Sequence, residues 1–215
     1  DLAGVNHDGN INKAMKLIEV AKESGCDAIK FQTFNPDNLV CINTRKVKYQ
    51  QLNDGDEGNQ YSMLKKLALT NEDFIRLHKS CEHHKIEFLS TPYDPISVKF
   101  LNDLNVRLFK VASADIIDPL LNKAISETNK KVIISTGMSI LEEIENCLKI
   151  YKNYKKENIC LLHCVSNYPC SKESLNLSVI PHLKKLFKTS VGFSDHTTDF
   201  FSSAIALALG SEVIE

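Results

Sequence analysis

The sequence lacks any run of five or more like charges, and its formal net charge is -1 at pH 7 over 215 residues. Nucleic acids and anionic membranes bind clustered basic residues, so this distribution favours a small-molecule partner over either of them. No stretch approaches 18 apolar residues, and the first ten residues lack the basic and apolar regions of a signal peptide. We therefore expect a cytoplasmic protein with no nucleic-acid or membrane partner.

Several catalytic and structural motifs are also missing. There is no C-x-x-C pair among the seven cysteines, which predicts reduced thiols and no disulfide framework. There is no H-x-H or H-E-x-x-H pattern, so zinc is weakly supported, while a loosely held divalent ion with oxygen ligands stays open. The absence of a G-x-S-x-G turn argues against a serine hydrolase.

Short apolar runs rich in β-branched residues alternate with amphipathic helical stretches along the whole chain. This order is typical of parallel strands joined by right-handed crossovers. The expected strands are Leu2 to Val5, Ala28 to Phe31, Glu87 to Leu89, Leu108 to Val111, Val132 to Ser135, Cys160 to His163, Ser190 to Phe193 and Val213 to Ile214. The expected helices are Asn12 to Ser24, Asn71 to His84, Ser97 to Leu104, Pro119 to Thr128, Ile140 to Lys152, Asn176 to Phe187 and Phe200 to Leu209.

Two α/β architectures compete for this pattern, a (β/α)8 TIM barrel and an open doubly wound sheet. The strand-to-strand repeat is mostly about 22 to 31 residues, close to one β/α unit of a barrel. Polar clusters follow nearly every strand, whereas in an open sheet they gather near one switch point. We therefore predict one TIM barrel domain over residues 1–215, incomplete at both ends and truncated in strand 8. The long polar segment 35–70 predicts an insertion loop after strand 2, which lies over the active-site rim or acts as a mobile lid.

Barrel chemistry lies at the carboxyl ends of the strands, and polar residues occupy most of those positions here. A purely structural barrel would not need so many. The candidates are Asn6, Lys30, Gln32, Thr91, Lys110, Ser113, Asp115, Ser135, Ser166, Tyr168, Ser194 and His196.

Lys30 and Lys110 are the sharpest signal, because each closes an apolar strand. One explanation is that both lysines simply extend to solvent at strand ends. A second is a phosphate site, since a phosphate dianion needs point charges together with hydroxyl or amide donors. A third is Schiff-base chemistry, in which one lysine attacks a carbonyl.

Three histidines, His7, His163 and His196, follow predicted strands. A single histidine at such a rim more often donates a hydrogen bond or orients substrate than binds a metal. His196 is the best ligand candidate, because the carboxylate and hydroxyl neighbours in Ser-Asp-His-Thr can fix its tautomer.

Seven segments at these strand ends, taken together, resemble the barrel domain of the sialic acid synthase family, which includes the legionaminate and pseudaminate synthases. The segments occur in family order and cover essentially the whole chain: GVNHDGN, DAIKFQTF, FLSTPYD, FKVASAD, IISTGMS, LLHCVSNYP and VGFSDHT. The resemblance implies condensation of phosphoenolpyruvate with an N-acylated mannosamine-type sugar, giving a nine-carbon 2-keto acid and phosphate. It also implies a Mn²⁺ or Mg²⁺ cofactor that polarises the sugar aldehyde, and a homodimer of the full-length protein.

The resemblance also implies a role for each candidate residue. Lys30, Thr91, Lys110, Ser113 and Ser135 would hold the phosphate of phosphoenolpyruvate, and Ser166 and Tyr168 would approach its carboxylate. Gln32 and Asp115 would face the reacting sugar, Asn6 and Ser194 would contact substrate, and His196 would bind the metal. Tyr168, Gln32 and Asp115 are the expected catalytic residues.

This sequence departs from the family pattern in three ways. Leu2 stands where the family has a glutamate, and the family's second metal-binding histidine lies just beyond the position of Glu215. The C-terminal antifreeze-like (SAF) domain of the family is expected to be absent. Two other functions therefore stay open: an inactive barrel fragment that still binds phosphoenolpyruvate or phosphate, and a Schiff-base aldolase. The acceptor sugar stays open as well, although HCVSNYP favours a free sugar over a phosphorylated one.

Overall fold

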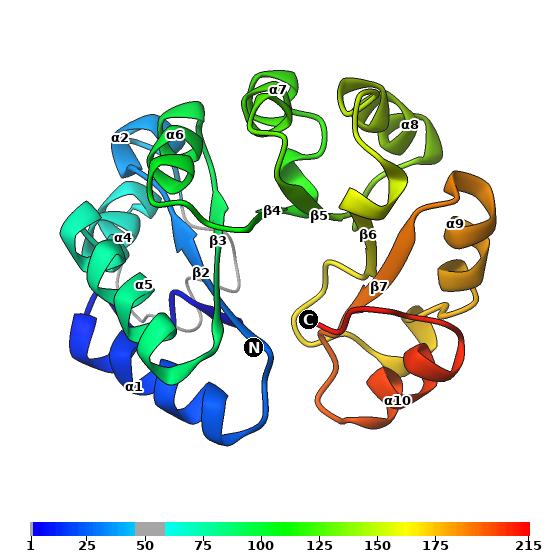
Figure 1. Ribbon diagram of the computed structural model, residues 1–215, viewed down its shortest axis with the longest axis horizontal. Coiled ribbons are helices and arrows are strands. Elements are labelled where there is room, and N and C mark those ends of the chain that lie inside the picture. The colour runs from blue at the N-terminus through cyan, green and yellow to red at the C-terminus, as the bar shows by residue number, and fades with distance from the viewer. Residues whose placement is uncertain (1, 46–58) are drawn as a thin grey trace. The chain divides into compact units, whose positions relative to one another are not determined.

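The computed structural model describes residues 2–45 and 59–215, which belong to two compact units, residues 1–106 and residues 107–215. In each unit, parallel strands alternate with helices along the chain (Figure 1). The prediction of parallel α/β structure is therefore confirmed. All seven cysteines are free thiols, also as predicted. Within the part of the chain that the structure describes, no helix combines the length and the hydropathy needed to cross a bilayer.

Unit 1 contains a three-stranded parallel sheet of order β1-β2-β3. Its strands are β1 (Leu2–Gly4), β2 (Ala28–Thr33) and β3 (Glu87–Pro92), and its described helices are α1 (Ile11–Glu23), α2 (Pro36–Leu39), α4 (Gln60–Leu67), α5 (Asn71–His84) and α6 (Pro95–Asp103). Phe31 and Phe88 stack with ring centroids 5.8 Å apart, and both are buried. α5 packs on β3 and on α1, which closes this small core.

The described part of the segment 35–70, predicted as a loop, contains two helices, α2 and α4. They contact each other, and the Tyr61 hydroxyl donates a hydrogen bond of 2.6 Å to Asp37 Oδ1. Asn35 and Asn59 cap the two helices with their side chains, which explains how a polar sequence forms them. Residues 46–58 of the expected lid lie outside the described residues, so the role of a lid stays a prediction.

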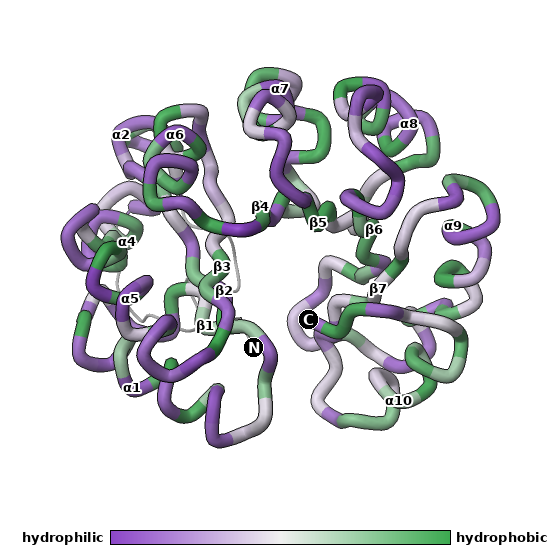
Figure 2. Tube along the Cα trace, viewed as in Figure 1, coloured by the Kyte–Doolittle hydropathy of each residue, from purple (hydrophilic) through white to green (hydrophobic). Residues whose placement is uncertain are grey.

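Unit 2 contains a four-stranded parallel sheet of order β4-β5-β6-β7. Its strands are β4 (Leu108–Val111), β5 (Lys131–Ser135), β6 (Ile159–Cys164) and β7 (Ser190–Ser194). Its helices are η1 (Ser113–Asp115), α7 (Pro119–Glu127), α8 (Leu141–Ile150), η2 (Lys156–Asn158), η3 (Lys172–Ser174), α9 (Val179–Phe187) and α10 (Phe201–Ala208). Figure 2 shows hydrophobic residues along β5 and β6 and mixed polarity on the helices, as expected for buried parallel strands covered by amphipathic helices.

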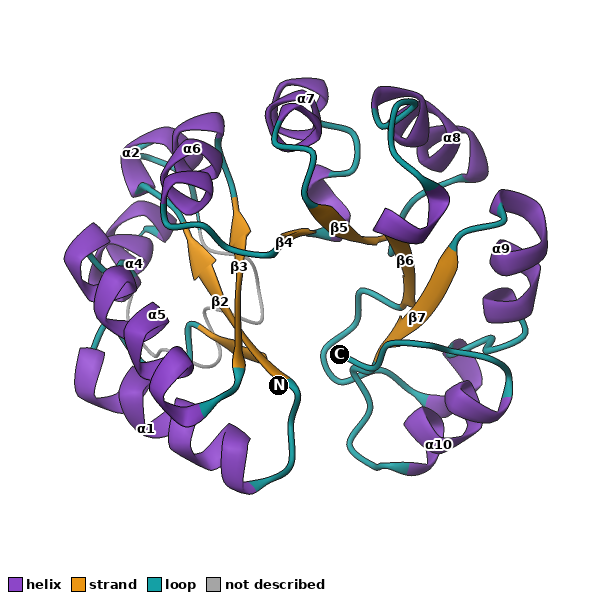
Figure 3. Cartoon of the chain, in the orientation of Figure 1, coloured by secondary structure: helices purple, strands orange, loops and turns teal. Residues whose placement is uncertain are grey.

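The helices α7, α8, α9 and α10 all lie on one side of the unit 2 sheet (Figure 3). A doubly wound sheet carries helices on both faces, so this arrangement contradicts that alternative within the unit. The sheet is also strongly curved. Val213 to Glu215 run beside β7, with an isolated parallel bridge between Phe193 and Ile214, where the sequence predicted the start of an eighth strand.

One contact within unit 2, between Lys110 on β4 and Glu215, shows that the sheet is curved. Lys110 Nζ lies 3.6 Å from Glu215 Oε2. Four strand spacings separate their backbones, about 19 Å in a flat sheet at about 4.8 Å each. The two side chains together are too short to bridge that span, so the sheet must bend toward the face that carries Lys110.

Asp-Pro pairs start two of the helices that follow strands. Asp94 and Asp118 are the N-cap residues of α6 and α7, and Pro95 and Pro119 occupy the first helical turn. An aspartate side chain accepts hydrogen bonds from the otherwise unpaired first amides, and proline lacks the amide that would need a partner there. Asp118 lies three residues after the end of η1. Because it fixes the start of α7 there, it also restricts the conformation of the polar turn after β4.

Candidate active site at the carboxyl ends of the strands

Lys110 is the centre of the polar cluster in unit 2. It is 4% exposed, and its Nζ donates to Ser135 Oγ at 2.7 Å and to the Val111 carbonyl at 3.1 Å. Lys110 pairs in register with Ile133 of β5, two residues before Ser135. Side chains two apart on a strand share a face, so the register brings the ammonium and the hydroxyl together. A buried cation beside a hydroxyl is suited to bind an anion.

A second cluster adjoins the end of β5 and is organised by Gly137. The Gly137 amide donates to Ser113 Oγ at 3.1 Å, and Ser113 Oγ lies 3.3 Å from Cys164 Sγ. A Cβ at position 137 would lie 2.5 Å from Ser166 Oγ, 2.8 Å from Cys164 Sγ and 2.9 Å from Ser113 Oγ. Only glycine lets these three side chains approach the backbone so closely. Two predicted phosphoenolpyruvate contacts, Ser113 and Ser166, therefore converge here.

His196 is fixed by the loop that follows β6. Its Nδ1 lies 2.6 Å from the Val165 carbonyl, which can only accept, so we assign the ring proton to Nδ1. The other nitrogen, Nε2, then carries a lone pair and accepts from Ser194 Oγ at 3.2 Å. The Tyr168 ring lies against the imidazole with centroids 4.1 Å apart, although Tyr168 is 64% exposed. The tautomer is the one that a metal ligand requires.

Asp115, in η1, combines partial burial with an incomplete set of hydrogen bonds. Its Oδ2 is buried and has no hydrogen-bond partner among the described residues. Burial raises the pKa of the Asp115 carboxyl to about 6; the nearby Asp118 carboxylate also raises it, and the Lys110 ammonium opposes both. A carboxyl with a pKa near neutrality can donate or accept a proton during a reaction.

The predicted residues of unit 1 form their own group. Lys30 and Gln32 are two residues apart on β2, and Gln32 pairs in register with Thr91 on β3, so all three lie on one face of this sheet. Lys30 and Thr91 are buried, and Gln32 is half-buried. Asn6 lies in the turn after β1 and is exposed. The expected convergence of Lys30 and Lys110 on one anion stays a prediction.

Two other histidines near strand ends, His7 and His163, are structural. His7 Nδ1 accepts from the Gly9 amide at 3.1 Å, and His163 Nε2 donates to the Leu175 carbonyl at 2.7 Å. Burial lowers the pKa of both, which favours the neutral ring.

Similarity to known proteins identifies the family of this chain. A family model described as the NeuB family matches residues 17–215. The chain belongs to the NeuB family. The N,N'-diacetyllegionaminic acid synthase of Campylobacter jejuni is 43% identical over 218 residues, which cover 99% of this chain and 64% of that protein. The protein of the same name from Legionella pneumophila is 41% identical, with 99% and 61% coverage. This chain therefore spans somewhat under two thirds of these relatives.

Solved structures place the chain in the same NeuB-family group. The crystal structure of N-acetylneuraminic acid (sialic acid) synthetase from Leptospira borgpetersenii, in complex with citrate, has a TM-score of 0.86 and 32% identity, covering all of this chain and 70% of that one. The Bacillus subtilis spore coat polysaccharide biosynthesis protein spsE has a TM-score of 0.83 and 30% identity, covering all of this chain and 57% of that one.

The described residues do not by themselves form a metal site of the kind that the NeuB-family resemblance implies. His196 offers a suitable Nε2, but residues 2–45 and 59–215 contain no group of three His, Cys, Asp or Glu side chains placed to hold a metal ion. One nitrogen donor is too few to fix an ion. The described residues therefore do not by themselves support a chemical step that depends on a metal ion.

Sequence reasoning missed two features of the NeuB-family site in unit 2. A glycine in STGM predicts no more than a turn, yet side-chain atoms of Ser166, Cys164 and Ser113 lie 2.5 to 2.9 Å from where a Cβ of residue 137 would be. Glu215 was noted only as a landmark, yet its carboxylate approaches Lys110. Glu215 follows the predicted last strand, so the rule that chemistry lies at strand ends could have identified it.

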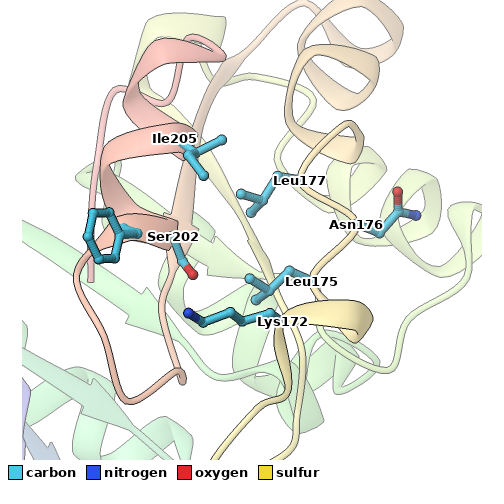
Figure 4. Close-up of a pocket in the computed structure, with 7 residues that line it drawn as sticks. Lys172, Leu175, Asn176, Leu177, Ser202 and Ile205 are labelled. Atoms are coloured by element: carbon cyan, nitrogen blue, oxygen red, sulfur yellow. The ribbon is translucent and has the colours of Figure 1, made fainter.

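A cavity of about 390 Å³ lies apart from these residues, between α10 and the segment around η3. It is lined by Lys172, Leu175, Asn176, Leu177, Phe201, Ser202 and Ile205 (Figure 4). None of the predicted site residues lines it. The cavity is therefore a separate feature of unit 2 from the polar residues at the strand ends.

Proposed function

We propose that this chain is the barrel portion of a synthase that condenses phosphoenolpyruvate with an N-acylated mannosamine-type aldose. The product is a nine-carbon, sialic-type 2-keto acid. In support, relatives over nearly the whole chain are named legionaminic acid, pseudaminic acid and N-acetylneuraminate-9-phosphate synthases, the pseudaminic acid synthase of Campylobacter jejuni at 32% identity and the human N-acetylneuraminate-9-phosphate synthase at 33%. Because this chain spans 64% of the legionaminic acid synthase that it matches, the proposal concerns the activity of a whole protein of that kind.

The observation that carries the proposal is the buried ammonium of Lys110. Its three nearest polar partners are all oxygen atoms, from Val111, Ser135 and Glu215. An incoming phosphate can take the place of the Glu215 carboxylate as the anionic partner, while Ser135 supplies a directional hydroxyl. Burying a charge costs free energy, because the ammonium loses its hydration. The presence of a buried lysine at this position therefore favours a functional role.

The proposed roles follow the resemblance. Phosphate contacts come from Lys30, Thr91, Lys110, Ser113 and Ser135, carboxylate contacts from Ser166 and Tyr168, sugar contacts from Gln32 and Asp115, and further substrate contacts from Asn6 and Ser194. In the reaction, the enol carbon of phosphoenolpyruvate bonds to the aldehyde carbon, one water is consumed, and phosphate leaves. With its raised pKa, the Asp115 carboxyl suits proton transfer at the sugar aldehyde.

The finer features of the fold and assembly belong to the same proposal. We infer a (β/α)8 barrel, supported by the bend of the β4–β7 sheet and by the one-sided helices of unit 2. If a divalent ion is bound, His196 would be one of its ligands, and the ion would supply polarisation of the sugar aldehyde. A homodimer of the full-length protein is proposed on the resemblance alone.

The experiment is an assay of phosphate release from phosphoenolpyruvate by the full-length protein, with Mn²⁺ or Mg²⁺ present. We expect release only when an N-acylated mannosamine-type sugar is added, and a panel of free and 6-phosphorylated sugars identifies the acceptor. Release without sugar, or none with any sugar, would overturn the proposal. Borohydride with pyruvate should trap no adduct, because the proposed condensation forms no Schiff base with a lysine, whereas a trapped adduct would favour the aldolase alternative.

A further inference from the structure

A buried polar cluster lies directly behind the turn that carries Ser113 and Asp115. Its centre is Asn122 of α7, which is 0% exposed. Asn122 Nδ2 donates to the carbonyl of Asp115 at 2.8 Å and to that of Asp118 at 2.7 Å, with a weaker contact of 3.3 Å to Ile116. One amide group therefore holds both ends of the segment from Asp115 to Asp118.

The side-chain oxygen of Asn122 also has hydrogen-bond partners. Asn122 Oδ1 accepts from the Tyr151 hydroxyl at 3.0 Å and from Cys147 Sγ at 3.5 Å. Tyr151 is 1% exposed and lies at the C-cap of α8. The amide thus links the turn after β4 to two helices, and its orientation is fixed because donors and acceptors both have partners.

Packing alone does not explain an asparagine at this position. The neighbouring buried positions of α7, Leu121 and Ile125, are both apolar, as expected for a helix face against a core. A buried amide contributes less to stability than an apolar side chain of similar size unless all its hydrogen bonds form. Unlike a leucine, Asn122 supplies N–H donors that hydrogen-bond to the backbone carbonyls of the turn.

We propose that Asn122 is a positioning residue that fixes the Ser113–Asp118 turn for the reaction. This inference rests on the proposed function, because it assigns Ser113 to the phosphate and Asp115 to the sugar. Asn122 touches only backbone atoms of the turn, so it acts through Asp115 and Ser113 and not on substrate. The tether sets where these two side chains lie relative to Lys110.

The Asp115 carboxyl reports on this tether. Burial is the main cause of its raised pKa, and the charges that act on it are those of Asp118 and Lys110. If the turn loses its tether, Oδ2 gains access to water and the pKa of Asp115 falls toward the ordinary value of 3.8. A loss of overall stability, by contrast, would not change the pKa of Asp115 in the molecules that stay folded.

The test uses the full-length protein and two variants. Asn122→Leu combined with Tyr151→Phe removes the tether and leaves no unpaired hydroxyl, so an apolar core is retained. Tyr151→Phe alone is the matched control, because the three carbonyl contacts of Asn122 remain. NMR titration of ¹³C-labelled aspartate carboxyls, with the Asp115 signal assigned from Asp115→Asn, needs neither substrate nor activity.

We expect the double variant to lower the pKa of Asp115 clearly and to reduce kcat by about 10- to 100-fold, with little change in the KM for sugar. The Tyr151→Phe control should keep the wild-type pKa of Asp115 and most of kcat. A folded double variant with the wild-type pKa would overturn the inference, as would a control that matches the double variant. If the double variant does not fold, Asn122→Ala, which removes every side-chain donor and adds no charge, is judged by the same criteria. A wild type without synthase activity would refute the proposed function alone, since the titration still decides the role of Asn122.

Discussion

Lys110→Met should weaken phosphoenolpyruvate binding far more than Ser113→Ala. Methionine keeps the unbranched aliphatic part of the side chain but removes the ammonium. The Lys110 side chain is only 5% exposed. A hydrogen bond from a charged group contributes about 1.5 to 3 kcal/mol, whereas one from a neutral hydroxyl contributes about 1 kcal/mol. At about 1.4 kcal/mol per tenfold, a loss of about 2 kcal/mol for Lys110→Met raises Kd about 30-fold, against about fivefold for Ser113→Ala.

Isothermal titration of phosphoenolpyruvate into the full-length variants measures this difference. Lys131→Met is the matched control, because Lys131 begins β5 in the same sheet but is exposed and lies at the opposite end of the strand from Ser135. It removes the same charge from the protein and should leave Kd nearly unchanged. The reasoning is refuted if Lys110→Met binds like wild type, or if Lys131→Met costs as much as Lys110→Met, since the effect would then come from net charge.

Three further perturbations test other parts of the structure. The pKa of Asp115 is about 6 in the folded state against an ordinary value of 3.8, so the folded state binds more protons between these pH values. The free energy of unfolding should therefore fall as pH rises from about 3.8 to about 6. Urea titrations at successive pH values measure this fall, and Asp115→Asn should remove it. Gly137→Ala forces a Cβ within 2.9 Å of three side-chain atoms and should destabilise by about 1 to 3 kcal/mol in a urea titration, whereas an unchanged midpoint would mean that the cluster is loose. Thr70→Ala removes the capping box of α5 and should cost about 1 kcal/mol by the same measurement, whereas Thr70→Ser should cost little, and equal losses would contradict the capping role.

Much of the fold follows from local patterns in the sequence. The hydrophobic periodicity of the sequence predicts a helix over Asn71 to His84, and the structure has those bounds. β4 likewise spans Leu108 to Val111 as predicted, because an apolar run between turn residues is a local signal. The pattern failed for α2 and α4, where short polar helices depend on asparagine caps and on each other and not on an apolar stripe.

The sequence predicts which polar residues lie at the strand ends but not how they are connected. Placing Lys110 and Ser135 at neighbouring strand ends needed only the β/α repeat, and their 2.7 Å contact follows from it. The approach of Glu215 to Lys110 depends on the curvature of the sheet, which no local pattern encodes. The contacts of Asn122 join α7 to the turn after β4 and to α8, so they become visible only once the tertiary fold is known.

Incorporation of labelled carbon into product tests the central claim most directly. The full-length protein is incubated with ¹³C₃-phosphoenolpyruvate and the N-acylated mannosamine-type sugar selected by the phosphate assay, and the products are analysed by mass spectrometry. The account predicts one new acid that carries all three labelled carbons joined to the intact sugar, formed in step with phosphate. Label that appears only in pyruvate, or phosphate released without a labelled sugar acid, would contradict it.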